Sequence, residues 1–269
     1  MTDDGKGTAS AADANGEAGV RPSVWDRPER PARPDRNALS REQIVRAAIE
    51  LIDREGPEAL SMRRLAASMG VGAMSLYWHV ERKADLLELV ADAIFGELDL
   101  PVEPSGDWRT DLRLIALATR ALFIRHPWLL QSMGSGVPHT GPNFLRHVEF
   151  TFASLARLGV PMPMMLATAG AVDSYVFGST LEQAMEANLP SDPDERSALS
   201  ASYIAAIDRG DYPTLSTMRD IFLDWNESAE ATEERFIYGL DALLDGLGRR
   251  LSDAGYLPCT EEHDDGEAS

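Results

Sequence analysis

Three aromatic side chains stand next to one another at Tyr77, Trp78 and His79, within the stretch VGAMSLYWHV. Successive residues of a helix lie about 100° apart, so three in a row span about 200° and cannot all face a core. At least one large ring must therefore point outward, although either Tyr77 or Trp78 can still serve mainly in core packing. The phenol hydroxyl, the indole N–H and the imidazole N–H are all suited to donating hydrogen bonds to phosphate oxygens.

The helices that must position these rings are indicated by capping residues and apolar spacing. Ser40 followed by Gln43 is a capping box, and Gly56 follows the last apolar position. These signals predict a helix that begins after Ser40 and ends before Gly56. Ser61 is the expected N-cap of a second, shorter helix, and Gly70 ends it. This pattern indicates a small helical unit directly before the aromatic stretch.

A short third helix is expected over 73–79 and a longer fourth one over 82–98. Two short helices joined by a turn of about three to four residues that contains glycine form a helix-turn-helix. Leu76 and Val80 are the expected inward anchors of the third helix. Such spacing also occurs in helical proteins that do not bind DNA, so the pattern by itself leaves the function open.

The remainder of the chain shows no β alternation, so the expected fold class is all-α: a three-helix helix-turn-helix domain followed by a larger helical domain. Further helices are expected over 107–125, 126–133, 142–158, 163–188, 194–209, 213–224 and 231–254. The expected divisions are a disordered Arg- and Pro-rich arm (1–38), the helix-turn-helix domain (39–98), the larger domain (99–256) and a disordered acidic tail (257–269).

The charge of the chain is distributed unevenly. Its net charge is −19, but residues 1–85 carry 13 Lys and Arg against 14 Asp and Glu, whereas the remainder carries 12 against 30. This asymmetry fits an N-terminal part that binds a polyanion and a C-terminal part with another role. Acidic surfaces also aid solubility, so charge alone does not decide between the two explanations.

Several classes of protein are disfavoured. The single cysteine, Cys259, allows no intramolecular disulfide, and together with the lack of a signal peptide it predicts a cytoplasmic protein. The sequence contains no run of about 18 apolar residues, so no membrane span is expected. No Gly-x-Ser-x-Gly or metal-hydrolase motif is present, so we expect no enzyme, no catalytic residue and no cofactor.

Residues 40–98 resemble the DNA-binding domain of the TetR family of bacterial repressors, with SLYWHV as the recognition helix and K-x-DLL at the start of the next helix. SLYWHV is most similar to the tetracycline-repressor subgroup, which the segments GPNFLRHVEFTFASLARLGV and AGAVDSYVFGSTLEQ also resemble. The arm is similar to that of actinobacterial regulators of antibiotic exporters. The resemblance implies a homodimer that places one recognition helix per subunit in a major groove and leaves double-stranded DNA when a small-molecule inducer moves the helix at 82–98.

The resemblance assigns DNA contacts to this region. It implies that Arg63 reads a guanine or contacts phosphate, and that Lys83 binds phosphate. Ala73 and Met74 stand where the tetracycline repressor has glutamine and proline, so we expect a different operator. The full set of expected DNA-binding residues is Ser61, Arg63, Ala73, Met74, Ser75, Tyr77, Trp78, His79 and Lys83, with Arg30, Arg33 and Arg36 of the arm.

The ligand site is expected in the middle helices, where apolar and aromatic side chains accompany a few polar ones. The candidates are Trp128, Met133, His139, Phe144, His147, Met165, Tyr175 and Phe177. Each of them can equally be a core residue. His139 lies about where the tetracycline repressor keeps its magnesium-binding histidine, but no carboxylate or second histidine follows at ligand spacing, so no metal site is expected.

The implied dimer would use helices near 163–188 and 231–254, with Phe236, Leu240, Leu243, Leu244 and Leu247 forming one apolar stripe. The same stripe can instead belong to the core of one subunit. The favoured function is a ligand-responsive repressor of efflux or antibiotic-related genes. A DNA-binding regulator without a ligand, or a helical enzyme with a fortuitous helix-turn-helix, remains an alternative.

Overall fold

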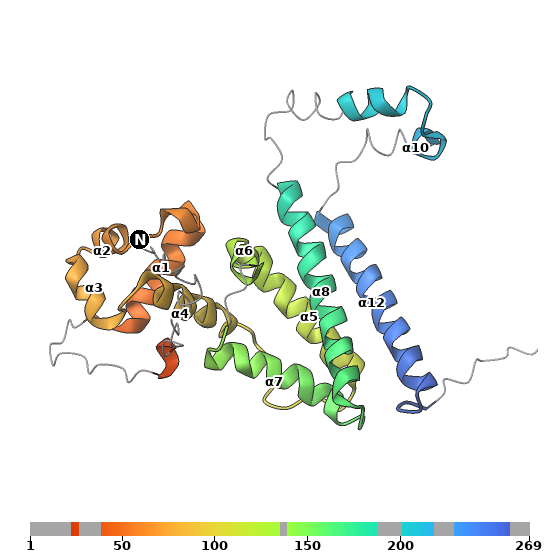
Figure 1. The fold of residues 1–269 in the computed structure, drawn as a ribbon, viewed down its shortest axis with the longest axis horizontal. Helices are drawn as coiled ribbons and strands as arrows, with labels where there is room; N and C mark the ends of the chain where they lie inside the picture. Colours follow the sequence, from red (N-terminus) through yellow and green to blue (C-terminus); the bar gives the residue numbers. More distant parts are fainter. Residues whose placement is uncertain (1–22, 27–38, 135–138, 188–200, 218–228, 259–269) are drawn as a thin grey trace, which may run out of the picture.

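The structure, a computed structural model, describes residues 23–26, 39–134, 139–187, 201–217 and 229–258. All regular elements in these ranges are helical, which confirms the all-α prediction (Figure 1). They are η1 (Val24–Asp26), α1 (Arg41–Glu55), η2 (Pro57–Ala59), α2 (Met62–Ser68), α3 (Ala73–His79), α4 (Lys83–Phe95), α5 (Trp108–Arg125), α6 (Trp128–Gly134), α7 (Pro142–Ala156), α8 (Met162–Ala187), α10 (Pro213–Thr217) and α12 (Ala229–Asp253).

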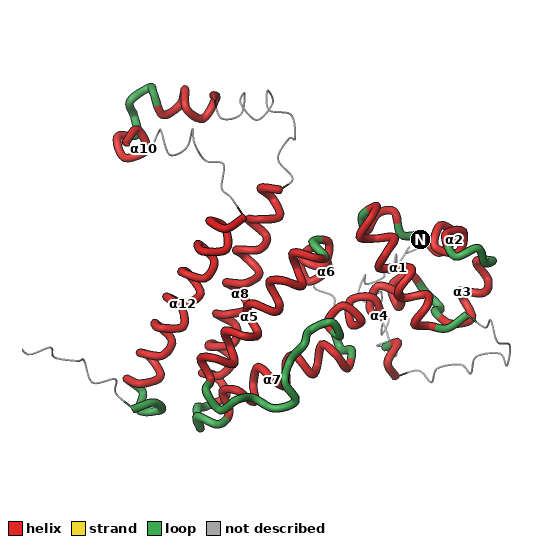
Figure 2. The backbone as a smooth tube through the Cα atoms, turned by 180° about the vertical axis from the view of Figure 1, so that it is seen from behind, coloured by secondary structure: helices red, strands yellow, loops and turns green. Residues whose placement is uncertain are grey.

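The helices form a small N-terminal bundle and a larger C-terminal body. In Figures 1 and 2, α1 to α4 gather at one end, and α5, α8 and α12 run side by side at the other. Helices α4 and α7 connect the two parts, since α4 packs against both α1 and α7. No helix in the described ranges is long and apolar enough to cross a membrane.

The ends of α1 follow from the capping residues. The Ser40 side chain accepts a hydrogen bond from the Gln43 backbone N–H (3.1 Å), and the Gln43 side chain accepts one from the Ser40 N–H (3.0 Å). Gly56 closes the helix with φ 82°, a conformation that side chains disfavour. The predicted capping box and stop residue are therefore confirmed.

The predicted helix at 126–133 begins two residues late. His126 precedes Pro127, and a residue before proline is pushed out of the helical region. His126 accordingly has φ −127° and ψ 68° and caps α5 rather than starting α6, which begins at Trp128. The predicted helix at 194–209 is described only from residue 201, where 201–207 is helical, and the one at 213–224 only as α10.

The apolar stripe of α12 lies in the core of this chain. Phe236, Leu240 and Leu244 are 3% exposed or less, and Leu243 and Leu247 pack against the same core. Assigning this stripe to a dimer interface was therefore wrong. Because the stripe contacts α5 and α8 of the same chain, any partner subunit must use another face of these helices.

A buried arginine on α5 connects this helix to α8 and α12. The guanidinium of Arg120 on α5 pairs with Glu233 on α12 and donates to the Gln183 side chain on α8 (3.1 Å). It also stacks 4.4 Å from the centre of the Phe236 ring. Arg120 is thus fully partnered although it is only 6% exposed.

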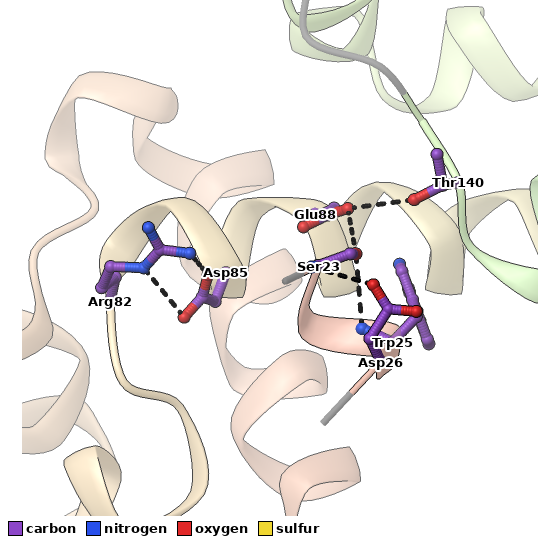
Figure 3. Close-up of polar contacts among 7 residues, drawn as sticks. All are labelled: Ser23, Trp25, Asp26, Arg82, Asp85, Glu88 and Thr140. Atoms are coloured by element: carbon purple, nitrogen blue, oxygen red, sulfur yellow. Dashed lines mark hydrogen bonds and ion pairs between the residues drawn. The ribbon is translucent and has the colours of Figure 1, made fainter. Parts of the chain in front are cut away.

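Part of the N-terminal arm is ordered, which the proline-rich sequence did not predict. Residues 24–26 form the short turn η1 on the surface of α4, with Val24 only 4% exposed. The Ser23 hydroxyl donates to Glu88 of α4 (3.0 Å), and the same carboxylate oxygen accepts from the Thr140 hydroxyl (3.3 Å; Figure 3). One carboxylate of α4 therefore contacts both the arm and the loop before α7.

Candidate nucleic-acid interface and ligand cavity

Helices α2 and α3 form the predicted helix-turn-helix. The turn is held by a hydrogen bond from the Val71 N–H to the Ala66 carbonyl (2.9 Å), and Gly70 supplies the left-handed residue with φ 67°. Leu65 on α2 and Leu76 on α3 are fully buried between the helices. The predicted inward anchors, Leu76 and Val80, are therefore confirmed.

The outer face of α3 carries the aromatic side chains. Tyr77 is 41% exposed and Trp78 is 44% exposed, so the alternative that one of them serves mainly in the core is wrong. His79 at the C-terminal end of α3 is half-buried. Met74 is 80% exposed and Ser75 is also exposed, so the N-terminal half of the same face carries no charged side chain.

Two basic side chains lie on the neighbouring helices α2 and α4. Arg63, in the first turn of α2, and Lys83, in the first turn of α4, are both exposed and have no ion pair among the described residues. The Ser61 side chain caps α2 by accepting from the Arg64 N–H (3.2 Å), which leaves its hydroxyl hydrogen available to another acceptor. The arm residues Arg30, Arg33 and Arg36 lie outside the described residues.

Arg64 differs from Arg63 because it is held by a carboxylate. Its guanidinium pairs with Glu55 at the end of α1, which Arg54 also contacts at 2.7 Å. Hydrogen bonding by Arg54, with the charges of both arginines, lowers the pKa of Glu55. The ion pair with Glu55 thus distinguishes two adjacent arginines of α2: Arg64 is held by a carboxylate, whereas Arg63 has no ion pair among the described residues.

The larger domain contains a cavity of about 460 Å³ next to the α4–α7 contact. Four of the eight predicted ligand residues line it: Met133, Phe144, His147 and Phe177. The sequence missed the other lining residues, which come from four different helices: Phe95, Thr119, Phe123, Val148, Asp173, Ser174 and Val176. The apolar ones have the spacing of core residues, so no sequence signal distinguishes them. Asp173 differs, because it is the one charged residue between positions 158 and 181 of the sequence.

The other four predicted ligand residues do not line this cavity. The Trp128 indole N–H donates to Asp53 of α1 (2.7 Å), and the Tyr175 hydroxyl donates to the Phe236 carbonyl on α12 (2.9 Å). Met165 packs against the core near the start of α8. His139 lies in the loop before α7, its ring centre 5.7 Å from that of Phe144, where burial lowers its pKa.

A second hollow, about 790 Å³, lies between the first turns of α8 and the last turns of α12. Its charged residues, Arg250 and Asp253, are exposed. The first cavity differs because polar atoms are buried in its wall. Thr119 Oγ1 and His147 Nδ1 have no hydrogen-bond partner among the described residues, although both side chains are less than one-tenth exposed.

The cavity wall contains two titratable groups. Burial lowers the pKa of His147 to about 4, so its ring is neutral near pH 7. Partial loss of hydration raises the pKa of Asp173 to about 6, although this lining side chain is also exposed to solvent. The wall therefore combines aromatic rings, neutral hydrogen-bonding groups and one carboxylate.

Helix α7, which lines the cavity, is joined to α4 by a capping contact. The Asp92 carboxylate of α4 accepts hydrogen bonds from the N–H groups of Asn143 (2.9 Å) and Phe144 (3.0 Å) in the first turn of α7. Asn143 also donates its amide to the Asp92 carbonyl (3.1 Å). Gly141 is packed so closely that a Cβ there would overlap the Asp92 side chain.

A second contact joins α1 to the start of the larger domain. Asp53 Oδ1 lies 2.8 Å from His126 Nδ1 and accepts the Trp128 indole hydrogen bond. These two aromatic residues flank Pro127 at the α5–α6 corner. Trp128, expected at the ligand site, instead connects the helix-turn-helix bundle to the rest of the chain.

Comparison with known proteins gives the same assignment for both parts of the chain. Residues 44–90 match the family model "Bacterial regulatory proteins, tetR family", and residues 100–251 match "Tetracyclin repressor-like, C-terminal domain". An HTH-type transcriptional regulator of Saccharopolyspora erythraea is 40% identical over 198 residues, covering 74% of this chain and 82% of its own. The HTH-type transcriptional repressor DrrR1 of Streptomyces coeruleorubidus is 29% identical over 256 residues, covering 90% and 91%.

The fold is similar to that of a solved regulator with a ligand. The crystal structure of the TetR family protein ActR from Streptomyces coelicolor in complex with actinorhodin superposes with a TM-score of 0.66. The two chains are 26% identical, and the match covers 80% of this chain and 98% of ActR. The family-model match over more than half of the chain and the 40% identical relative show that this protein belongs to the TetR family of bacterial transcriptional regulators.

Proposed function

We propose that this protein is a homodimeric repressor that binds a palindromic operator and releases it when a small molecule enters the cavity. The observation that supports this most directly is the position of α4. Its N-terminal end follows the recognition helix α3, while Phe95 at its C-terminal end lines the cavity. A ligand that displaces α4 therefore acts on both sites through one rigid element.

The DNA-binding role is supported by the exposed face of α3. Tyr77 and Trp78 project large rings with polar ends, and in a major groove they would reach sugar and phosphate. Arg63 and Lys83 would supply the charge, with Arg63 placed to contact a base edge. Ala73 and Met74 can only contact thymine methyl groups or fill space, so the operator differs from the tetracycline operator.

Ligand responsiveness is supported by the cavity and by a solved relative that carries a bound ligand. A partly open space of about 460 Å³ with mostly apolar walls has the size and character of a small-molecule site. ActR, which shares the fold, is seen in complex with actinorhodin. The inducer here is a small molecule that enters this cavity, and the regulated gene is an efflux or antibiotic-related one.

The homodimer is supported by apolar side chains that α8 and α12 leave on their outer faces. Leu166, Leu181 and Met185 on α8 are 37% to 64% exposed, and Tyr238 on α12 is 79% exposed. These residues are separate from the buried stripe of α12 that fills the chain's own core. Packing the two helices against those of a second subunit would bury them in a four-helix arrangement.

The test is selection of binding sites from random double-stranded DNA with the full chain, followed by gel-shift measurements over a range of salt concentrations. The expected result is a palindromic site whose affinity falls steeply with salt. Trp78→Ala should lose most of this affinity, and Tyr212→Ala, which removes an exposed aromatic side chain directly before α10, should not. The absence of any selected sequence, or equal binding by both variants and the wild type, would contradict the proposal.

A further inference from the structure

The cavity wall carries charge of one sign only. Among the lining residues that the structure describes, Asp173 is the one charged side chain near neutral pH, since His147 is neutral and the rest do not ionise. We propose that the cavity selects a planar aromatic molecule that carries a protonated amine, with the amine paired to the Asp173 carboxylate. This inference deepens the proposed function by naming the ligand class of the same cavity.

The aromatic part of the ligand is indicated by four phenylalanines from four helices. Phe95 of α4 and Phe144 of α7 meet edge to face with ring centres 5.0 Å apart. Phe123 of α5 and Phe177 of α8 form a second edge-to-face pair at 6.4 Å. A flat ring system between such pairs makes stacking and edge contacts that a flexible aliphatic chain cannot make. The same rings attract a nearby cation through their faces.

The positive charge of the ligand is indicated by Asp173. This carboxylate on α8 has no hydrogen bond or ion pair among the described residues, and its pKa is raised because it has lost hydration. A buried or half-desolvated carboxylate is stabilised when a cation provides the missing partner. An anionic ligand would meet repulsion from Asp173, and no cationic side chain among the described lining residues would offset it.

The two neighbouring arginines do not provide a partner for the Asp173 carboxylate. Arg120 follows Thr119 in the sequence, but its guanidinium points to α12, where Glu233 and Gln183 hold it. Arg146, on the α7 turn that precedes His147, is exposed. The carboxylate at the cavity wall is therefore left for an incoming group.

Two further atoms would fix the orientation of the ligand. Thr119 Oγ1 and His147 Nδ1 are buried in the wall and lack partners among the described residues. A hydroxyl or carbonyl substituent on the ring system would satisfy them, because an unpaired buried polar atom costs about 1–3 kcal/mol. The expected ligand is thus a polar-substituted aromatic cation and not a plain hydrocarbon.

The experiment compares three probes built on one tricycle: 9-aminoacridine, a cation near neutral pH, acridine, which is neutral, and acridine-9-carboxylate, which is an acid. Calorimetry with the full chain, without DNA, should give saturable binding that is tightest for 9-aminoacridine. Asp173→Asn should weaken binding of the cation about tenfold or more and leave the neutral probe unchanged. Glu182→Gln, which removes an exposed carboxylate of the same helix outside the cavity, should leave all three affinities unchanged.

A pH titration of the wild-type protein provides a second measurement that needs no folded variant. Asp173 gains its proton as the pH falls through about 6, so the affinity for 9-aminoacridine should decrease between about pH 7.5 and pH 5. The cavity faces of α4, α5 and α7 contribute no charged side chain in the described ranges, and His147, with a pKa of about 4, stays neutral over this window.

Three results would overturn the inference: tighter binding of the acid than of the cation, equal binding of the cation by Asp173→Asn and the wild type, or no saturable binding of any probe. Each is separate from failure of the proposed function, which is measured by operator binding on the same preparations. If the protein binds the aromatic cation through Asp173 but selects no DNA, the proposed ligand class stands and the proposed repressor function is wrong.

Discussion

The Asp92 carboxylate on α4 accepts the backbone N–H of Asn143 in the first turn of α7 at 2.9 Å, so the helix that adjoins the recognition helix caps the helix that lines the cavity. Burial raises the pKa of Asp92, and several hydrogen bonds from α7 act in the opposite direction. Any movement of α7 would therefore act directly on α4.

Gly141→Ala tests this contact. The added Cβ would overlap the Asp92 side chain and force α7 away from α4, so we expect the free energy of unfolding to fall by about 1–3 kcal/mol. We also expect a change in the inducer concentration needed for operator release. Gly72→Ala, at the open N-cap of α3 with a similar backbone conformation, is the matched control and should cost less stability than Gly141→Ala. Urea unfolding compares the two, and equal stability would show that the contact is looser than described.

Arg63→Ala and Arg64→Ala should differ, although the residues are adjacent. Arg63 projects without an ion pair among the described residues, so its removal should weaken operator binding and relax one base position by about 1–3 kcal/mol. Arg64 is held by Glu55, so its removal should act mainly on the end of α1. Binding to a panel of single-base operator variants measures this. Equal loss on every sequence would mean that Arg63 contacts only phosphate.

Replacing the outward residues of α3 should separate DNA binding from folding. Trp78→Ala should weaken DNA binding while changing stability by less than about 0.5–1 kcal/mol, because the side chain is 44% exposed. Leu76→Ala, in the same turn, should cost about 2–5 kcal/mol because Leu76 is fully buried. Thermal unfolding and gel shifts on both variants make the comparison. A large loss of stability in Trp78→Ala would show that this ring serves mainly in core packing.

Two truncations should distinguish the parts of the arm. Deleting residues 1–36 removes the buried Val24 and the Ser23–Glu88 hydrogen bond, so we expect both lower stability and weaker DNA binding. Deleting residues 1–22 keeps η1 on α4 and removes only Arg21 of the five arginines in the arm, so Arg27, Arg30, Arg33 and Arg36 remain and stability should be unchanged. Thermal unfolding of the two truncated proteins provides the measurement. Identical stability would show that η1 adds nothing to α4.

Asp173→Asn should stabilise the ligand-free protein above about pH 6. Folding raises the pKa of this carboxyl to about 6 from its ordinary value of 3.8, so the native state binds the proton more tightly than the unfolded state. The ionised form therefore opposes folding at higher pH, and the penalty vanishes as the pH falls towards about 4, where both states are protonated. Melting temperatures of the two proteins should thus differ at about pH 7.5 and converge at low pH. A constant difference would point to altered packing.

The sequence by itself determined the local elements and the role of the N-terminal bundle. Ser40, Gln43 and Gly56 set the ends of α1 because capping involves residues only a few positions apart. Three adjacent rings required an outward face on α3, since helical geometry distributes neighbours around the axis.

The tertiary structure decided which side chains share a surface. Phe144 and Trp128 have similar apolar surroundings in the sequence, yet one lines the cavity and the other reaches Asp53 on α1. The α12 stripe looks equally suited to a partner subunit and to the chain's own core, and packing against α5 and α8 placed it in the core. Helical periodicity shows that a face is apolar but carries no information about what covers it, because that depends on contacts between helices far apart in the chain.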